Sequence, residues 1–217
     1  MRLKNVKGAE EIIKQSSYVI LNPKEYSGSW NKLFLNDNKI HIEIGMGKGD
    51  FIINNALTYP DINFIGIEKF DSVIVRAVEK LNKLEKEIPN LKLIRMDALE
   101  IDEVFNHEID CLYLNFSDPW PKNRHEKRRL SSTIFLNKYD NIFKNDNLIK
   151  IKTDNRKFFE YSLMNIVNYG YSIDDVSLDL YKDDIKDNIP TEYEKKFHKL
   201  GLPIYKLDVI KTKLDIS

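Results

Sequence analysis

Residues 41–57 read "HIEIGMGKGDFIINNAL", an apolar strand pattern followed by a glycine loop and the start of a helix. The glycines Gly45, Gly47 and Gly49 allow a tight turn and a close approach of the backbone to a ligand, and the following helix points its N-terminus into the same space. A glycine turn after a buried strand also occurs in α/β proteins of many functions. The stretch therefore predicts an α/β unit whose loop can hold a flat or anionic ligand.

Short apolar runs typical of β-strands alternate with longer helical patterns from residue 39 onward. In chain order these runs are "KIHIEI", "NFIGIE", "LKLIRM", "IDCLYLNF", "NLIKIKT", "YSIDDVSLDLY" and "PIYKLDVIKT". Strands that alternate with helices predict a parallel sheet with helices on both faces, and continuous apolar runs fit strands buried on both sides. Apolar residues at helical spacing also predict an amphipathic helix over residues 70–87.

The end of the chain departs from this alternation. Only residues 191–200 separate the last two runs, which is too short for a crossover to a parallel strand. We therefore expect a seven-stranded, mostly parallel sheet with an antiparallel C-terminal strand. Length favours one domain over residues 1–217, with residues 1–38 as an N-terminal cap or extension and residues 39–217 as the core.

Composition limits the classes of function. Lys plus Arg and Asp plus Glu both number 34, so a site for a polyanion must be a local patch of positive charge. Cys111 is the only cysteine, which excludes an internal disulfide, and the histidines lack the spacing of metal ligands, so we expect no metal site. No apolar stretch has the length of a membrane span or the form of a signal peptide, so we expect a cytoplasmic protein.

Acidic residues follow the first three strands of the predicted core. Glu43 precedes the first glycine by two positions, Glu68 ends the second strand, and Asp97 follows the third. Carboxyl ends of parallel strands share the edge where open α/β sheets bind ligands, so we expect these acids to surround one cofactor. Glu68 is placed to accept hydrogen bonds from ribose hydroxyls, and Asp97 to meet an adenine amino group.

S-adenosylmethionine is the cofactor that fits this loop best. Asp50 occupies the third glycine position of a dinucleotide fingerprint, where its charge would face a pyrophosphate, so a nicotinamide oxidoreductase is disfavoured. S-adenosylmethionine has no phosphate and carries an ammonium group, which an acid such as Glu43 can accept. We expect the backbone at Gly45 and Gly47 to contact this cofactor.

Residues 115–129 read "NFSDPWPKNRHEKRR" and follow the fourth strand. The two prolines lack backbone donors and have a fixed φ, so they hold Asp118 and Trp120 in defined directions. An aromatic ring stacks on a nucleobase and a carboxylate accepts hydrogen bonds from its amino and imino groups, which predicts a base pocket with guanine as the best fit. The cations that follow predict a patch for phosphates.

With these motifs the chain resembles the bacterial tRNA (guanine-N7)-methyltransferase family, which has the class I, Rossmann-like, S-adenosylmethionine-dependent fold. The motifs that carry the resemblance are "EIGMGKGDF", "FIGIEKF", "NFSDPWPKNRHEKRRL", "IKTDN" and "TEYEKKF". The resemblance implies methyl transfer from S-adenosylmethionine to N7 of the variable-loop guanosine of tRNA, position 46. S-adenosylhomocysteine would be the product and tRNA the partner.

The resemblance also implies roles for individual residues. The acids implied to contact the cofactor are Glu43, Glu68, Asp97 and Asp118, and Asp118 is also implied to be catalytic. The residues implied to hold the substrate are Lys122, Asp154, Thr191, Glu192, Tyr193 and Glu194. The residues implied to touch RNA are Arg124, His125, Glu126, Lys127, Arg128 and Arg129. Thr191 and Glu194 also have the spacing of a capping box, in which each side chain bonds the backbone N–H of the other.

Two further functions stay open at this point. An amino-methyltransferase acting on adenine or cytosine carries an Asp/Asn-Pro-Pro-aromatic motif after its fourth strand, but here the second proline follows Trp120. A catalytically silent RNA-binding protein with the same fold would bind tRNA without regard to S-adenosylmethionine. The sequence implies no membrane association and no obligate protein partner, and it leaves monomer and homodimer as alternatives.

Overall fold

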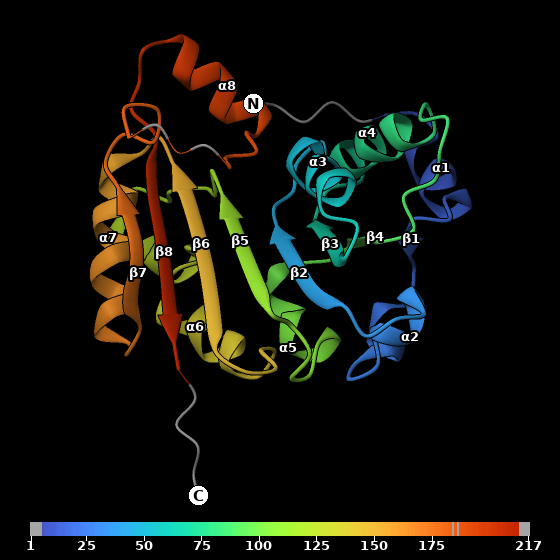
Figure 1. Ribbon diagram of the computed structural model, residues 1–217, viewed down its shortest axis with the longest axis horizontal. Helices are drawn as coiled ribbons and strands as arrows, with labels where there is room; N and C mark the ends of the chain where they lie inside the picture. Colours follow the sequence, from blue (N-terminus) through green and yellow to red (C-terminus); the bar gives the residue numbers. More distant parts are fainter. Residues whose placement is uncertain (1–5, 184, 186, 213–217) are drawn as a thin grey trace, which may run out of the picture.

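The computed structural model describes residues 6–183, 185 and 187–212, and one eight-stranded sheet runs through it (Figure 1). The strand order is β1-β4-β3-β2-β5-β6-β8-β7. The strands are β1 (Val19–Ile20), β2 (Lys39–Ile44), β3 (Ile62–Glu68), β4 (Leu91–Arg95), β5 (Cys111–Asn115), β6 (Asn147–Thr153), β7 (Ser172–Ser177) and β8 (Tyr205–Lys211). Pairs from β1 to β6 are parallel, whereas β8 is antiparallel to both of its neighbours.

The predicted strands and the antiparallel C-terminal strand are confirmed, but the sheet has eight strands where the sequence predicts seven. The additional strand, β1, lies within the expected N-terminal cap and pairs with β4 through Val19 beside Leu93 and Ile20 beside Ile94. Two residues are too few to give the alternation by which strands are recognised in a sequence. The described part of residues 1–38 therefore extends the sheet at its edge.

Helices cover both faces of the sheet, as predicted. On one face α1 (Ala9–Gln15), α3 (Asp50–Thr58) and α4 (Asp71–Leu81) bury apolar side chains against β3 and β4. On the other face α5 (Ile101–Val104), α6 (Thr133–Asp140) and α7 (Arg156–Asn168) share a core with β2, β5, β6 and β8, and α2 (Asn31–Phe34) contributes to it. No helix among these described residues is long and apolar enough to cross a lipid bilayer.

The helix predicted over residues 70–87 is shorter in the structure. It ends at Leu81, and the N–H groups of Lys83 and Leu84 donate to carbonyls three residues back, as in a closing turn. Pro89 disfavours helical backbone at the residue before it, and the chain must start β4 at Leu91. Leu84, which lies within the predicted helical range, is 40% exposed.

The carboxyl ends of β2 to β6 meet at one edge of the sheet, and α8 (Glu192–Lys199) lies beside that edge (Figure 1). Aromatic stacking helps hold it there. The ring of Phe116, just after β5, lies 6.3 Å from that of Tyr193 and 6.1 Å from that of Phe197, both nearly parallel to it. This edge therefore brings together the glycine loop, the loop after β5 and a helix from the end of the chain.

Candidate functional site

The loop between β2 and α3 presents its backbone to open space. Gly45 and Gly47 have φ values of 76° and 58°, and a Cβ atom at either position would meet no atom within 4 Å. The N–H groups of Gly45 and Met46 both donate to the carbonyl of Ile67, at 2.9 and 3.0 Å, which fixes the loop against the end of β3. A ligand can thus approach this backbone without displacing a side chain.

Glu68 binds the glycine loop from the end of β3. Its Oε2 accepts a hydrogen bond from the N–H of Gly47 at 3.2 Å, and its Oε1 accepts from the N–H groups of Lys69 and Phe70. Burial raises the pKa of Glu68, the three N–H groups partly offset this, and the charge of Asp118 adds to the rise. The charge of Asp118 thus acts on Glu68 from the loop after strand β5.

Glu43 is a buried acid with an unused oxygen. The side chain is 2% exposed, and its Oε1 accepts from Asn115 Nδ2 at 2.9 Å. Its Oε2, together with Asn115 Oδ1 and Ser117 Oγ, is buried without a hydrogen-bond partner among the described residues. Burial raises the pKa of Glu43 to about 7. Buried polar atoms without partners are costly, so these strand ends suit a ligand that brings donors.

Asp97 follows β4 and is held in place by two groups. Its Oδ2 lies 2.5 Å from Lys69 Nζ, and its Oδ1 accepts from the N–H of Leu99 at 3.0 Å. Partial burial acts to raise the pKa of Asp97, but the Lys69 ammonium and the Leu99 N–H lower it overall. The ion pair with Lys69, which directly follows Glu68, keeps Asp97 close to the end of β3.

The loop after β5 is fixed by Arg129. Its guanidinium donates to the carbonyls of Pro119 and Trp120 over 3.1–3.3 Å and lies 4.1 Å from the ring centre of Tyr161. Trp120 has a φ of 39°, a left-handed conformation that costs energy in a residue with a side chain. The resemblance implies that Arg129 touches RNA, and in the structure its guanidinium holds the loop.

Asp118 and Asp154 reach the same edge with free carboxylates. Asp118 is exposed in the loop after β5, and Asp154 is half-buried in the bend after β6. Neither side chain has a hydrogen bond or an ion pair to another residue that the structure describes. Both carboxylates therefore remain open to a further hydrogen-bond donor.

The basic run after Trp120 forms the 3-10 turn η3 (Asn123–Arg128). Its exposed cations and Lys122 make up what we call the η3 patch, which consists of Lys122, Arg124, Lys127 and Arg128. Glu126 is also exposed, whereas His125 packs its ring edge on Trp120. Arg128 lies 4.9 Å from the Trp120 ring centre, so the patch joins directly onto the loop that carries Asp118.

Of the residues 191–194, which the resemblance implies hold the substrate, two have buried side chains and two have exposed ones. Thr191 is buried and caps α8, its Oγ1 accepting from the N–H of Glu194 at 2.9 Å, so half of the predicted capping box is confirmed. Glu194 does not reach back to Thr191, because its carboxylate binds Lys152, Tyr181 and Asn188. Only Glu192 and Tyr193 are exposed, and Glu192 forms an ion pair of 2.7 Å with Lys48 of the glycine loop.

Lys152, in β6, is a site residue that the sequence did not reveal. Its Nζ donates to Asn188 Oδ1 at 2.6 Å, to the Ile189 carbonyl at 3.0 Å and to Glu194 Oε2 at 2.9 Å. Burial lowers its pKa although the charge of Glu194 acts against this. In "NLIKIKT" the lysines alternate with apolar residues, a pattern that predicts side chains facing solvent. The sequence shows no sign of burial at Lys152, because its partners lie at least 36 residues further along the chain.

The chain matches a protein family and is similar in sequence to named relatives. The family model described as "Putative methyltransferase" matches residues 37–207. A tRNA (guanine-N(7)-)-methyltransferase of Bacillus cytotoxicus is 51% identical over 210 residues, which are 96% of each chain. The protein of the same name from Bacillus subtilis strain 168 is 49% identical over 211 residues, 96% of this chain and 98% of the relative.

Solved structures with little sequence similarity share the fold. "Structure of an Antibiotic Related Methyltransferase" superposes with a TM-score of 0.63 at 18% identity, covering 86% of this chain and 94% of that one. A 16S rRNA (adenine(1408)-N(1))-methyltransferase from Catenulisporales acidiphilia, solved with its cosubstrate SAM, gives 0.61 at 15% identity, covering 91% and 95%. At these identities the likeness establishes the fold alone.

Proposed function

This chain belongs to the tRNA (guanine-N(7)-)-methyltransferase family, and on that premise we propose that it methylates N7 of the variable-loop guanosine of tRNA, position 46. The observation that carries the proposal is the convergence of acids around the glycine loop. Glu68 binds the N–H of Gly47, Glu43 keeps a buried oxygen without a partner, and Asp118 influences the pKa of Glu68.

The cofactor in this proposal is S-adenosylmethionine, which supplies a methyl group on a sulfonium and leaves as S-adenosylhomocysteine. The open backbone at Gly45 and Gly47 gives room for it. The free Oε2 of Glu43 suits an ammonium, since a buried carboxylate without a partner gains most from a charged donor. Glu68 would accept from the ribose hydroxyls and Asp97 from the adenine amino group.

Asp118 has the central role in positioning the base. Guanine N7 already has a free lone pair, so no proton has to be removed before it attacks a methyl carbon. Holding the two atoms about 3 Å apart and in line can lower the barrier by roughly 7–11 kcal/mol. We assign to Asp118 the orientation of the base and the stabilisation of positive charge developing on the ring. Asp154, after the neighbouring strand β6, would hold the base from the other side.

The remaining substrate contacts come from exposed residues. Glu192 and Tyr193 on α8 and Lys122 after the Asp118 loop would contact the tRNA near the target base. The η3 patch, with Arg124, Lys127 and Arg128, would bind the phosphate backbone and offset the few kcal/mol needed to unstack the base. Thr191 and Glu194 would act indirectly, by holding α8 in place.

Residues 1–217 would form one methyltransferase domain, with residues 1–38 extending its sheet at the edge and residues 39–217 as the core. The enzyme would work in the cytoplasm, because its tRNA substrate is there. It would act as a monomer or a homodimer without an obligate protein partner.

Transfer of a labelled methyl group from S-adenosylmethionine tests the proposal against its alternatives. We expect label in unmodified tRNA, none in a DNA duplex, and none in a tRNA transcript made with 7-deazaguanosine, which lacks the accepting nitrogen. Label in DNA, or in the 7-deazaguanosine transcript, would favour an amino-methyltransferase. Binding of tRNA without label, and without response to S-adenosylmethionine, would indicate a silent RNA-binding protein.

A further inference from the structure

Helix α8 carries more free positive charge than its sequence shows. Residues Glu192–Lys199 contain two acids, and cations from distant elements neutralise both. Lys48 of the glycine loop pairs with Glu192 at 2.7 Å, and Lys152 of β6 pairs with Glu194 at 2.9 Å. The helix's own lysines are therefore not needed to balance its acids.

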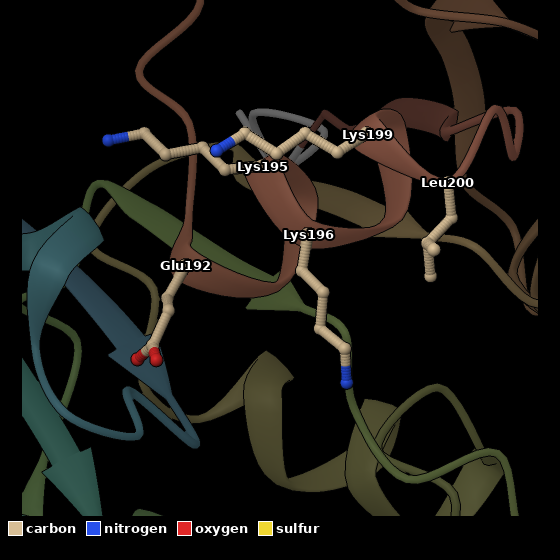
Figure 2. Close-up of a pocket in the computed structure, with 5 residues that line it drawn as sticks. All are labelled: Glu192, Lys195, Lys196, Lys199 and Leu200. Carbon is tan, nitrogen blue, oxygen red and sulfur yellow. The ribbon is translucent and has the colours of Figure 1, made fainter.

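Those lysines, Lys195, Lys196 and Lys199, form what we call the α8 lysine face. All three are exposed, and none forms an ion pair with another residue that the structure describes. Together with Glu192 and Leu200 they line a hollow of about 490 Å³ beside the helix, where Lys195 and Lys199 extend in the same direction (Figure 2). Three unpaired cations on two helical turns make a strong local field in a chain whose net charge is zero.

The α8 lysine face lies close to the site. Phe116 stacks on Tyr193 and Phe197, which joins α8 to the start of the loop that carries Asp118. The η3 patch follows Asp118 on the same loop, so free cations are present both on α8 and after Asp118. A polyanion that places one of its bases at Asp118 would pass near both groups.

We propose that the α8 lysine face binds phosphates of the tRNA backbone and is a second anchoring surface, separate from the η3 patch. The inference rests on the proposed function, because it takes the substrate to be tRNA. Lysine ammonium groups at an exposed helix face contact phosphates as point charges and do not read bases, so this surface would add affinity and orientation without sequence preference.

The salt dependence of equilibrium tRNA binding tests this surface. The variant Lys195→Gln/Lys196→Gln/Lys199→Gln removes the three charges, and log K against log salt concentration is measured with unmodified tRNA. Each phosphate contact contributes about 0.7 to 0.9 to the slope, so loss of all three should reduce it by roughly 2 to 3. The charge-preserving variant with arginine at the same positions should keep the wild-type slope.

A matched control removes three exposed lysines near the amino ends of the strands, on the side of the sheet away from the site. Its substitutions are Lys32→Gln, Lys39→Gln and Lys144→Gln. We expect this variant to keep the wild-type slope. Equal slopes for the α8 variant and the wild type, or equal reductions in the α8 and control variants, would overturn the inference while tRNA binding and methyl transfer by the wild type persist. Failure of the wild type to bind tRNA at all would instead overturn the proposed function, and this inference with it.

Discussion

Lys152 Nζ lies 2.9 Å from Glu194 Oε2, and this ion pair joins the end of β6 to α8 in the interior of the protein. The Glu194 side chain is 0% exposed and that of Lys152 is 12% exposed. Because Glu194 also binds Tyr181 and Asn188, the pair organises the segment before α8 as well as the helix. The exposed residues Glu192 and Tyr193 thus depend on a buried pair for their position.

Lys152→Met should be strongly destabilising, because it leaves the Glu194 carboxylate buried without its cation. We expect a loss of about 3–5 kcal/mol in the free energy of unfolding, measured by urea denaturation. The double variant Lys152→Met/Glu194→Leu should recover part of this loss. As a control, Arg156→Met removes one partner of an exposed ion pair on α7 and should cost less than about 1 kcal/mol. Strictly additive effects of Lys152→Met and Glu194→Leu, measured singly and together, would show that the two side chains do not interact.

Glu43→Gln should change how stability depends on pH. The pKa of Glu43 is about 7 in the folded protein, against 4.5 for an unperturbed glutamate. Between pH 4.5 and 7 the Glu43 carboxyl is protonated in the folded state and ionised in the unfolded state. The free energy of unfolding therefore falls as pH rises through this range, and the contribution of Glu43 becomes constant above pH 7. The gap between the two pKa values corresponds to about 3 kcal/mol.

In the absence of cofactor, the stability of Glu43→Gln relative to wild type should therefore be about 2.5 kcal/mol more favourable at pH 8 than at pH 5, because the unfolded glutamate is already largely ionised at pH 5. Urea denaturation at the two pH values measures the difference. The exposed Glu25→Gln is a control for the removal of a surface carboxylate. A relative stability of Glu43→Gln that is the same at both pH values would show that Glu43 is charged throughout.

Asp118→Asn keeps the shape of the side chain and removes its charge. We expect a loss of roughly 100-fold in kcat/KM for tRNA, since a single charge aimed at the reacting group has an effect of that order. If Asp118 orients the base and removes no proton, the single-turnover rate of the wild type at saturating cofactor should be flat between about pH 6 and 8. A rate that rises tenfold per pH unit in this range would assign Asp118 the role of a base.

Arg129→Gln and Arg124→Gln should separate a loop-holding arginine from an RNA-binding one. Arg129→Gln loses the bonds to the carbonyls of Pro119 and Trp120, so kcat should fall while the salt slope of tRNA binding stays at the wild-type value. Arg124→Gln should weaken tRNA binding and reduce the slope by about 1. A reduced salt slope of tRNA binding in Arg129→Gln would show that Arg129 contacts RNA phosphates.

The fold could be predicted from the sequence because its signals are local. Strand patterns, the glycine loop and the acids at strand ends all lie within short windows, and the shared edge of a parallel sheet then brings Glu43, Glu68 and Asp118 together. The short strand β1 and the end of α4 at Leu81 gave weaker signals. Strand β1 has only two residues, too few to show the alternation of apolar and polar side chains. In α4 the helical spacing of apolar residues continued to Leu84, although the helix ends at Leu81.

Side-chain partners that are distant in the chain could not be predicted. Arg128 and Arg129 are adjacent and chemically identical, yet Arg128 is exposed in the η3 patch and Arg129 binds main-chain carbonyls. Lys152 and Glu194 are 42 residues apart, so no window contains both. The capping box failed at Glu194 for the same reason, because a buried cation binds its carboxylate more strongly than one backbone N–H would.

The most direct test of the central claim is the position of the methyl group. Unmodified tRNA would be incubated with the protein and S-adenosylmethionine, then treated with borohydride and aniline, which cleave the chain at N7-methylguanosine. We expect a single cut at the variable-loop guanosine with the wild type and a strongly reduced cut with Asp118→Ala. Methylated tRNA that aniline does not cleave, or a cut that persists at full strength in Asp118→Ala, would contradict this expectation.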